Sequence, residues 1–274
     1  MYNDLERFII FTEREGFDKD QIFYSELYPD SFFGNSLLEL CCYYGAVDCF
    51  KLLRTKFNPE ITYKCLRFSF LRGNKEIMSE CLKYRKPDIY CMKYAIISHN
   101  IDFVTFLMNE YNLKIDLEKC TDFKNLESFL VYFGQTNDIY ESFVYSSMFN
   151  IPSLCEYFLS LDIDINAKNQ KRKTAIYCAV CSNSIETAKF LISHGVNINE
   201  KDEDGKTILH YATKKNYKGI CEFLISHGAN INEKDEYGKT ALHLAVFNNN
   251  KEISELLISH GGNINEKDYG GETS

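Results

Sequence analysis

A segment of eighteen residues occurs three times in the C-terminal part of the chain. It reads FLISHGVNINEKDEDGKT at 190–207, FLISHGANINEKDEYGKT at 223–240 and LLISHGGNINEKDYGGET at 256–273. Each copy begins 33 residues after the previous one. A fixed period of this length is typical of repeat proteins whose units pack only against their neighbours. The chain can therefore grow along one axis without a single large core.

Each unit is predicted to contain two short helices. Thr207 and Thr240 precede apolar runs, where Thr can cap a helix by accepting from an early backbone N–H. Ile220, Phe223 and Leu224 have the i, i+3, i+4 spacing of a buried helical face. Glycines after the helix ends suit a left-handed backbone, and the D-x-x-G segments predict tight turns. Such short helices depend on stacking for stability.

The segments between the copies complete a longer pattern. They read DEDGKTILHYA at 202–212 and DEYGKTALHLA at 235–245, with a looser version, NQKRKTAIYCA, at 169–179. This set resembles the ankyrin repeat over residues 161–274. Over residues 36–160 only the helix-pair rhythm remains, similar to protist proteins in which a diverged helical module precedes standard repeats. The resemblance implies an all-α, ankyrin-type helical-repeat solenoid with hairpin fingers in the C-terminal half.

Three regions are expected along the chain. Residues 1–35 are predicted to form an N-terminal helical cap, with helices over 2–13 and 18–27. Residues 36–160 are predicted to be the diverged helix-pair array, and residues 161–274 the standard repeats, ending at the start of an incomplete repeat. The natural protein would then continue past its present end, or this end would fray or dock against something; we favour a truncated sequence.

The breaks between paired helices predict where the fingers begin. They are expected near 45, 73, 99, 122, 149, 183, 216 and 249. The early spacings are roughly 23–28 residues and the later ones about 33, which indicates that the early units lack the finger. The first finger is expected near 162–173. Asn58-Pro59 is expected to open the second pair, with Asn as the cap and Pro at the first helical position.

The net charge and the amino-acid composition exclude several classes of binding partner. The net charge is −8, whereas nucleic acids and anionic membranes select positive surfaces. The N-terminus lacks the features of a signal peptide, and no apolar run is long enough to span a bilayer. The 11 cysteines lie mostly in helical patterns and are expected to be reduced in an intracellular, cytoplasmic protein. We expect no nucleic acid, membrane, small-molecule substrate, cofactor or metal.

The histidines recur with the period of the repeat. His194, His227 and His260 share one position, and His210 and His243 share another. A metal-binding ladder would need closer rings and help from carboxylates or thiolates, so we favour a structural role. The resemblance implies that the His of T-x-L-H bonds to neighbouring backbone and ties the units together.

Other motifs are weaker. Cys178 and Cys181 form a C-x-x-C pair, for which we favour packing in the core or groove over a redox site. Sequence signatures of nucleotide-binding loops, serine hydrolases and zinc proteases are absent. Asn199, Asn232 and Asn265 occupy the G-x-x-x-N position that is hydroxylated in some ankyrin proteins. Here we favour a structural role, with hydrogen bonds across the hairpin.

Positions at which the units differ separate the scaffold from a variable surface. In the resembled family, finger tips and exposed inner-helix positions form a concave surface that binds other proteins. The partner-binding residues predicted on this basis are Lys171, Lys173, Glu203, Asp204, Lys206, Lys214, Lys215, Glu236, Tyr237, Lys239, Phe247 and Asn248. Tyr237 and Phe247 are the candidate anchors. Alternatively, Phe247 packs on the next unit, and for the basic tip 171–173 we favour a solvated loop over a partner contact.

The resemblance implies non-catalytic protein–protein recognition through the concave face and the fingers. The expected mechanism is rigid presentation: stacking holds surface side chains in place, so little ordering entropy is lost on binding. The alternative is an enzyme or an enzyme-associated chain. It would need a pocket in residues 36–160 lined by convergent ionisable groups, or a catalytic domain beyond Ser274. Nucleic-acid binding is disfavoured by the net charge and would need a continuous basic stripe.

Overall fold

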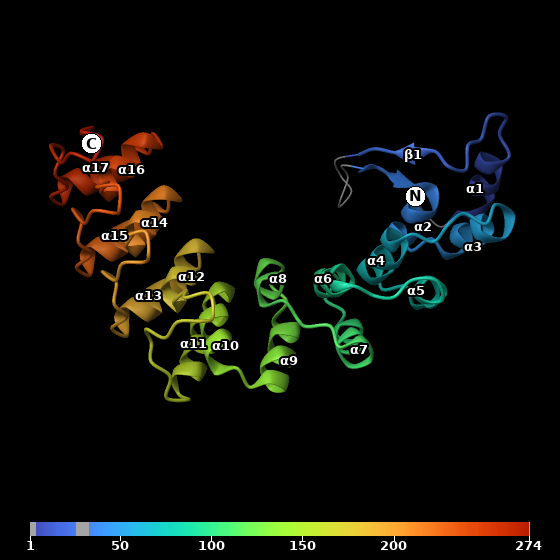
Figure 1. Ribbon diagram of the computed structural model, residues 1–274, viewed down its shortest axis with the longest axis horizontal. Helices are drawn as coiled ribbons and strands as arrows, with labels where there is room; N and C mark the ends of the chain where they lie inside the picture. Colours follow the sequence, from blue (N-terminus) through green and yellow to red (C-terminus); the bar gives the residue numbers. More distant parts are fainter. Residues whose placement is uncertain (1–3, 26–32, 274) are drawn as a thin grey trace. The chain divides into compact units, whose positions relative to one another are not determined.

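The computed structural model describes residues 4–25 and 33–273 (Figure 1). These residues contain 17 α-helices and one pair of two-residue antiparallel strands, so the all-α prediction is confirmed. None of the described helices combines the length and apolar character needed to cross a bilayer. The chain divides into two compact units, residues 1–132 and 133–274, with the boundary inside helix α9.

The first unit is a row of helix pairs. Inner helices α2, α4, α6 and α8 pack in sequence, and each of α3, α5 and α7 follows its inner helix. The elements are α1 (Leu5–Thr12), β1 (Ile22–Phe23), β2 (Asn35–Ser36), α2 (Leu37–Tyr44), α3 (Val47–Lys56), α4 (Tyr63–Arg72), α5 (Lys75–Leu82), α6 (Ile89–Ile97), α7 (Ile101–Tyr111), α8 (Leu117–Asp122) and, at the boundary, α9 (Leu126–Thr136).

The second unit repeats the same design with more regular spacing (Figure 1). Inner helices α10, α12, α14 and α16 pack on one another, as do outer helices α11, α13, α15 and α17. The elements are α10 (Ile139–Ser146), the 3-10 turn η2 (Ser147–Phe149), α11 (Pro152–Leu159), α12 (Ala175–Cys181), α13 (Ile185–Ser193), α14 (Ile208–Lys214), α15 (Lys218–Ser226), α16 (Ala241–Phe247) and α17 (Lys251–Ser259).

Left-handed residues separate the two helices of each pair. Positive φ angles occur there at Gly45, Gly73, His99, Lys124, Asn150, Asn183, Asn216 and Asn249. Gly and Asn adopt this conformation at low cost. The breaks agree with those predicted, the largest difference being at Lys124, where the sequence predicts the break near 122.

The loops between pairs differ in length between the units. In the first unit, the segments that follow α3 and α5 are only 57–62 and 83–88. In the second unit, the segment between α11 and α12 extends over 160–174, where the sequence predicts the first finger. The later inter-pair segments of the second unit, 194–207 and 227–240, have similar length. Fingers are therefore a feature of the second unit.

Arginine side chains tie the short loops of the first unit. Arg54 donates to the carbonyl oxygen of Pro59 at 2.6 Å, and its guanidinium lies 4.9 Å from the ring centre of Tyr84. The Arg85 guanidinium lies 5.1 Å from the ring centre of Tyr63. Stacked Arg–Tyr pairs bury apolar stem and ring surface together. In the first unit these side-chain contacts join neighbouring helix pairs, as the fingers do in the second unit.

The helix predicted over 18–27 is wrong. Residues 22–23 form β1, which pairs in antiparallel register with residues 35–36. Ile and Phe favour extended backbone when a partner strand is present, and local helical spacing does not reveal that partner. Within the expected helix over 2–13, α1 occupies residues 5–12; positions 2, 3, 26 and 27 lie outside the described residues.

The predicted start of the second helix pair is also wrong. Asn58 has a φ of 45° and follows the end of α3, so it does not cap the next helix. Helix α4 begins at Tyr63, and the Thr62 side chain caps it by accepting from the backbone N–H of Cys65. A left-handed Asn after one helix and an N-capping Asn before the next have similar local sequences.

The cysteines belong to the core of both units. All 11 are free thiols, of which Cys181 is half-buried and the others are buried. Burial raises the pKa of Cys120 to about 12 and that of Cys155 to about 11. Such thiols stay protonated and unreactive at neutral pH, which agrees with the structural role predicted for most of them.

Candidate binding groove

Four hairpin fingers of the second unit share one turn. Their tips are residues 169–173, 202–206, 235–239 and 268–272, and in each the first residue donates its N–H to the carbonyl of the fifth at 2.9–3.0 Å. The first side chain closes the turn. Its Oδ1 accepts from two backbone N–H groups of the tip, both at 2.9 Å in the case of Asp235. Asn169 makes the equivalent two bonds, so the looser first copy still forms a finger.

The fourth residue of each tip is left-handed. Gly205 has a φ of 71° and Gly238 one of 75°, whereas the first finger places Arg172 there with a φ of 59°. An L-residue with a side chain costs about 1–2 kcal/mol in this conformation, and glycine avoids the cost. The first finger therefore carries a cation at some expense in stability.

Backbone contacts connect neighbouring fingers. The N–H of Glu236 donates to the carbonyl of Asp204 at 2.9 Å, and the N–H of Tyr269 donates to that of Tyr237 at 3.0 Å. A Cβ on Gly205 would lie 3.0 Å from the Glu236 nitrogen. The fingers thus stand side by side as a connected edge.

This close approach predicts a graded pair of substitutions. Gly205→Ala is expected to lower the free energy of unfolding by about 2 kcal/mol, because it combines the left-handed strain with a backbone clash. Gly195→Ala is the control: its φ is 84°, and a Cβ there would meet nothing within 4 Å. It is expected to cost about 1 kcal/mol, from backbone strain alone. Equal losses in urea denaturation would contradict the close finger packing.

Asn199 and Asn232 bond between units rather than across their own hairpin, so the expectation is corrected at these two positions. Asn199 Nδ2 donates to the carbonyl of Gly228 at 3.1 Å, and Asn199 Oδ1 accepts from the N–H of Asn230 at 2.8 Å. Asn232 repeats both bonds one period later.

His210 links consecutive units, as the resemblance implies. Its Nδ1 lies 3.0 Å from the backbone nitrogen of Thr207 and accepts that N–H, which places the ring proton on Nε2. Nε2 donates to the carbonyl of Lys239 in the next unit at 3.2 Å. His243 makes the equivalent contacts with Thr240 and Glu272.

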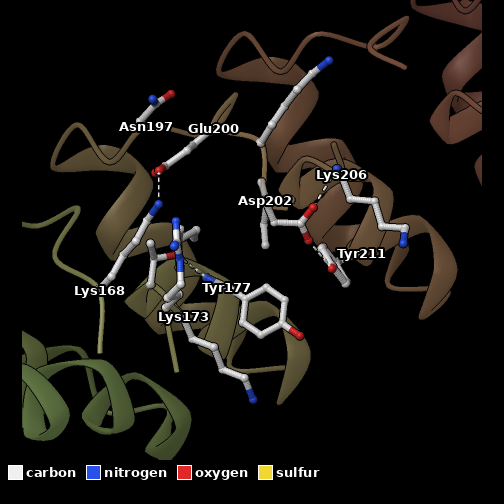
Figure 2. A pocket seen from close by; sticks show the side chains of 13 residues that line it. Lys168, Lys173, Tyr177, Asn197, Glu200, Asp202, Lys206 and Tyr211 are labelled. Atoms are coloured by element: carbon white, nitrogen blue, oxygen red, sulfur yellow. Dashed lines mark hydrogen bonds and ion pairs between the residues drawn. The ribbon is translucent and has the colours of Figure 1, made fainter. Parts of the chain in front are cut away.

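A hollow opens between the first and second fingers above α12 and α14 (Figure 2). Its floor includes Tyr177 and Tyr211, whose rings meet edge to face with centres 4.9 Å apart. The Tyr211 hydroxyl donates to the Asp202 carboxylate. Burial raises the pKa of both phenols, so they remain neutral. The two carboxylates of the hollow are Glu200 and Asp202, and its five cations are Lys168, Arg172, Lys173, Lys201 and Lys206.

A second hollow lies between the second and third fingers above α14 and α16, and shares Lys206 and Tyr211 with the first. Six of the predicted partner-binding residues line it: Asp204, Lys206, Lys214, Lys239, Phe247 and Asn248. We call the two hollows together the finger groove. It is formed by the fingers and by the inner helices α12, α14 and α16.

Phe247 is exposed over 81% of its surface. The Lys239 ammonium lies 5.7 Å from its ring centre. Lys214, one period earlier, is also exposed although α16 follows it. The alternative in which Phe247 packs on the next unit stays a prediction.

The remaining predicted residues lie at the finger tips or beside the groove. Lys171, Glu203, Glu236 and Tyr237 are exposed at the tips, and Lys215 is exposed at the end of α14. Lys173 lines the first hollow.

The sequence analysis did not single out Tyr177 or Tyr211, and for the tip that contains Arg172 it favoured a solvated loop. The signal for Tyr177 was present, because it stands at the T-x-L-H histidine position of the looser copy. Cys178 is buried, and Cys181 is half-buried beside Tyr177.

A hollow in the first unit bears on the catalytic alternative. It lies between outer helices α3 and α5, and four of its five charged groups form two ion pairs at the surface. Lys51 lies 2.5 Å from Glu76, and Lys83 lies 2.5 Å from Glu80. Within residues 4–25 and 33–273, no three His, Cys, Asp or Glu side chains are placed to hold a metal ion. This hollow gives the catalytic alternative no support.

Two family models match the chain. Ankyrin repeats (3 copies) match residues 143–235 and 203–268. A domain of unknown function (DUF3447) matches residues 57–132. No curated protein matches the chain. The C-terminal match covers α12, α14 and α16 and the first three fingers.

Proposed function

Because residues 143–268 belong to the ankyrin-repeat family, whose members are generally protein-interaction modules, we propose that this chain is a non-catalytic scaffold that holds a protein partner in the finger groove. The observation that carries the proposal is the exposed Phe247 ring in the wall of a hollow. Removing a large apolar side chain from water lowers the free energy of the complex when a partner covers it. Tyr237, 57% exposed on the adjoining finger, offers a second aromatic contact.

Rigid presentation is the proposed mechanism. The bonds from His210 and Asn199 to the next unit, together with those between neighbouring fingers, fix the groove before a partner arrives. A preorganised surface loses little conformational entropy on binding, so more of the contact free energy appears as affinity.

Removing both aromatic anchors tests the proposal. Tyr237→Ala combined with Phe247→Ala is expected to weaken capture of the partner by about 2 kcal/mol, since exposed aromatic anchors dominate interface energetics. The measurement is a pull-down with the full chain, followed by titration of the captured protein. Both side chains are exposed, so circular dichroism should show an unchanged fold.

The matched control is Tyr157→Ala. Tyr157 is 49% exposed but lies on outer helix α11, away from the residues that line the groove. It is expected to leave capture unchanged. If the double variant captures the same partner with the same affinity as the original chain, the proposed surface is wrong.

A further inference from the structure

The finger groove has the opposite charge balance to the chain. The whole sequence has a net charge of −8. In contrast, five cations and two carboxylates line the first hollow, and three lysines and one carboxylate line the second. A cationic groove in an acidic protein favours an anionic partner and disfavours a basic one.

Most carboxylates at the groove already have partners within the protein. Glu200 pairs with Lys168 at 2.7 Å, and Asp204 pairs with Lys206 at 2.8 Å. Asp202 accepts from the Tyr211 hydroxyl and from two N–H groups of its own turn. Lys201 pairs with Glu233 at 2.6 Å, and Lys239 lies 3.6 Å from Asp268. The surplus of positive charge therefore comes from the lysines that have no such pair.

Three lysines supply the surplus. Among the described residues, no ion pair joins Lys173, Lys214 or Lys215 to a carboxylate. The Lys173 ammonium lies 5.7 Å from the ring centre of Tyr177. Burial raises the pKa of the Cys181 thiol, and the charges of Lys215 and Lys173 oppose that shift. By geometry, Lys173 lines the first hollow and Lys214 lines the second, and Lys215 follows Lys214 at the end of α14.

At the fourth position of its tip, the first finger has a cation where the other three fingers have glycine. Arg172 adopts a φ of 59°, and its side chain is 72% exposed. It pairs with Glu203 at 3.1 Å, but that side chain is 74% exposed, so the pair is weak and a partner's carboxylate can replace it. Strain retained at an exposed tip points to a binding role.

Resting on the function proposed above, we infer that the partner segment is an acidic peptide that lies across the first and second fingers. Its carboxylates contact Arg172 and the three lysines Lys173, Lys214 and Lys215, and its apolar side chains contact the Tyr177–Tyr211 floor. The planar guanidinium and the mobile ammonium groups suit carboxylates in varied positions. A basic or neutral segment would leave the three lysines unpaired.

Peptide selection on the full chain tests the inference. A display library is selected against the protein, and the selected peptides are expected to be richer in Asp and Glu than the starting library. Replacing Lys173, Lys214 and Lys215 together with Gln is expected to weaken a selected peptide about tenfold. The control is Lys189→Gln, Lys218→Gln and Lys251→Gln on the outer helices, which changes the net charge equally and should leave affinity unchanged.

Arg172→Gly separates binding from folding. Glycine relieves the left-handed strain, so the melting temperature is expected to rise. Peptide affinity is expected to fall about threefold, since one exposed cation is lost. A residue with only a structural role would not give these opposite changes.

The outcomes distinguish the two proposals. Selected peptides that are neutral or basic, yet depend on Tyr237 and Phe247, would overturn the acidic assignment and leave the proposed function standing. Peptides insensitive to both sets of variants, or a selection that enriches nothing, would overturn both. A single-stranded oligonucleotide of equal charge serves as competitor. If it displaces the bound peptide as well as free peptide does, whatever its base sequence, the groove selects ligands by charge alone and the peptide assignment fails.

Discussion

Replacing Leu224 with alanine is expected to lower the free energy of unfolding by about 2–5 kcal/mol. Leu224 has no exposed surface and lies on α15, which packs between α13 and α17. The substitution removes buried methyl groups and leaves a cavity that close-packed neighbours fill only partly. Equilibrium denaturation of the full chain by urea measures the loss.

The adjacent Ile225 provides the control. It lies on the same helix but is half-buried, so Ile225→Ala should cost clearly less than Leu224→Ala. Leu191, one period earlier on α13, also has no exposed surface and should behave like Leu224. Losses that are the same for Ile225→Ala and Leu224→Ala would show that outer helices do not stack as described.

The second unit was largely predictable because each copy of the repeat packs against its neighbours in the same way. Leu191, Leu224 and Leu257 recur at the repeat period and all have no exposed surface. Conserved spacing within one chain reports the buried face directly, since the same side chain must meet the same neighbours in each unit. The turns at glycine could be predicted because glycine adopts the left-handed backbone conformation without steric cost.

The first unit was less predictable because its copies have diverged. Breaks at Gly73 and at His99 followed from local residue types. The β1–β2 pair did not, because residues 22–23 need a partner that is distant in sequence. The Arg85–Tyr63 contact also joins separate loops, and no local pattern reports such a pair.

The predicted partner-binding residues came from comparing units, and several of them lie together where the copies are closest. Lys206, Lys239 and Phe247 emerged as variable positions and do line the groove. Tyr177 was not singled out, and Arg172 was assigned to a solvated loop, because both belong to the looser first copy, where a departure from the repeat pattern resembles random divergence. The ion pairs that neutralise some groove residues and leave others free depend on side-chain geometry, which sequence spacing does not determine.

Replacing His210 with alanine is expected to lower the free energy of unfolding by about 2–4 kcal/mol. The ring is 1% exposed, accepts from Thr207 and donates to Lys239 in the next unit. Its removal leaves the buried Thr207 N–H without an acceptor and opens a cavity between α14 and the third finger. His194→Ala is the control: that ring is exposed and bonds only to Phe190 of its own helix among the described residues, so its loss should cost about 0.5–1 kcal/mol.

The pH dependence of stability distinguishes the hydrogen-bonding role of His210 from simple packing. Burial holds the pKa of the native imidazole below 6.5, so as pH falls through 6.5 the unfolded chain binds this proton before the folded chain does. Stability is therefore lost on acidification below 6.5 and is fully present above it. His210→Gln keeps an acceptor for Thr207, as in a capping box, but cannot titrate. It should cost less than His210→Ala and flatten the decline in stability between about pH 7 and pH 5. An unchanged decline in His210→Gln would mean that the histidine is not held neutral between the two units.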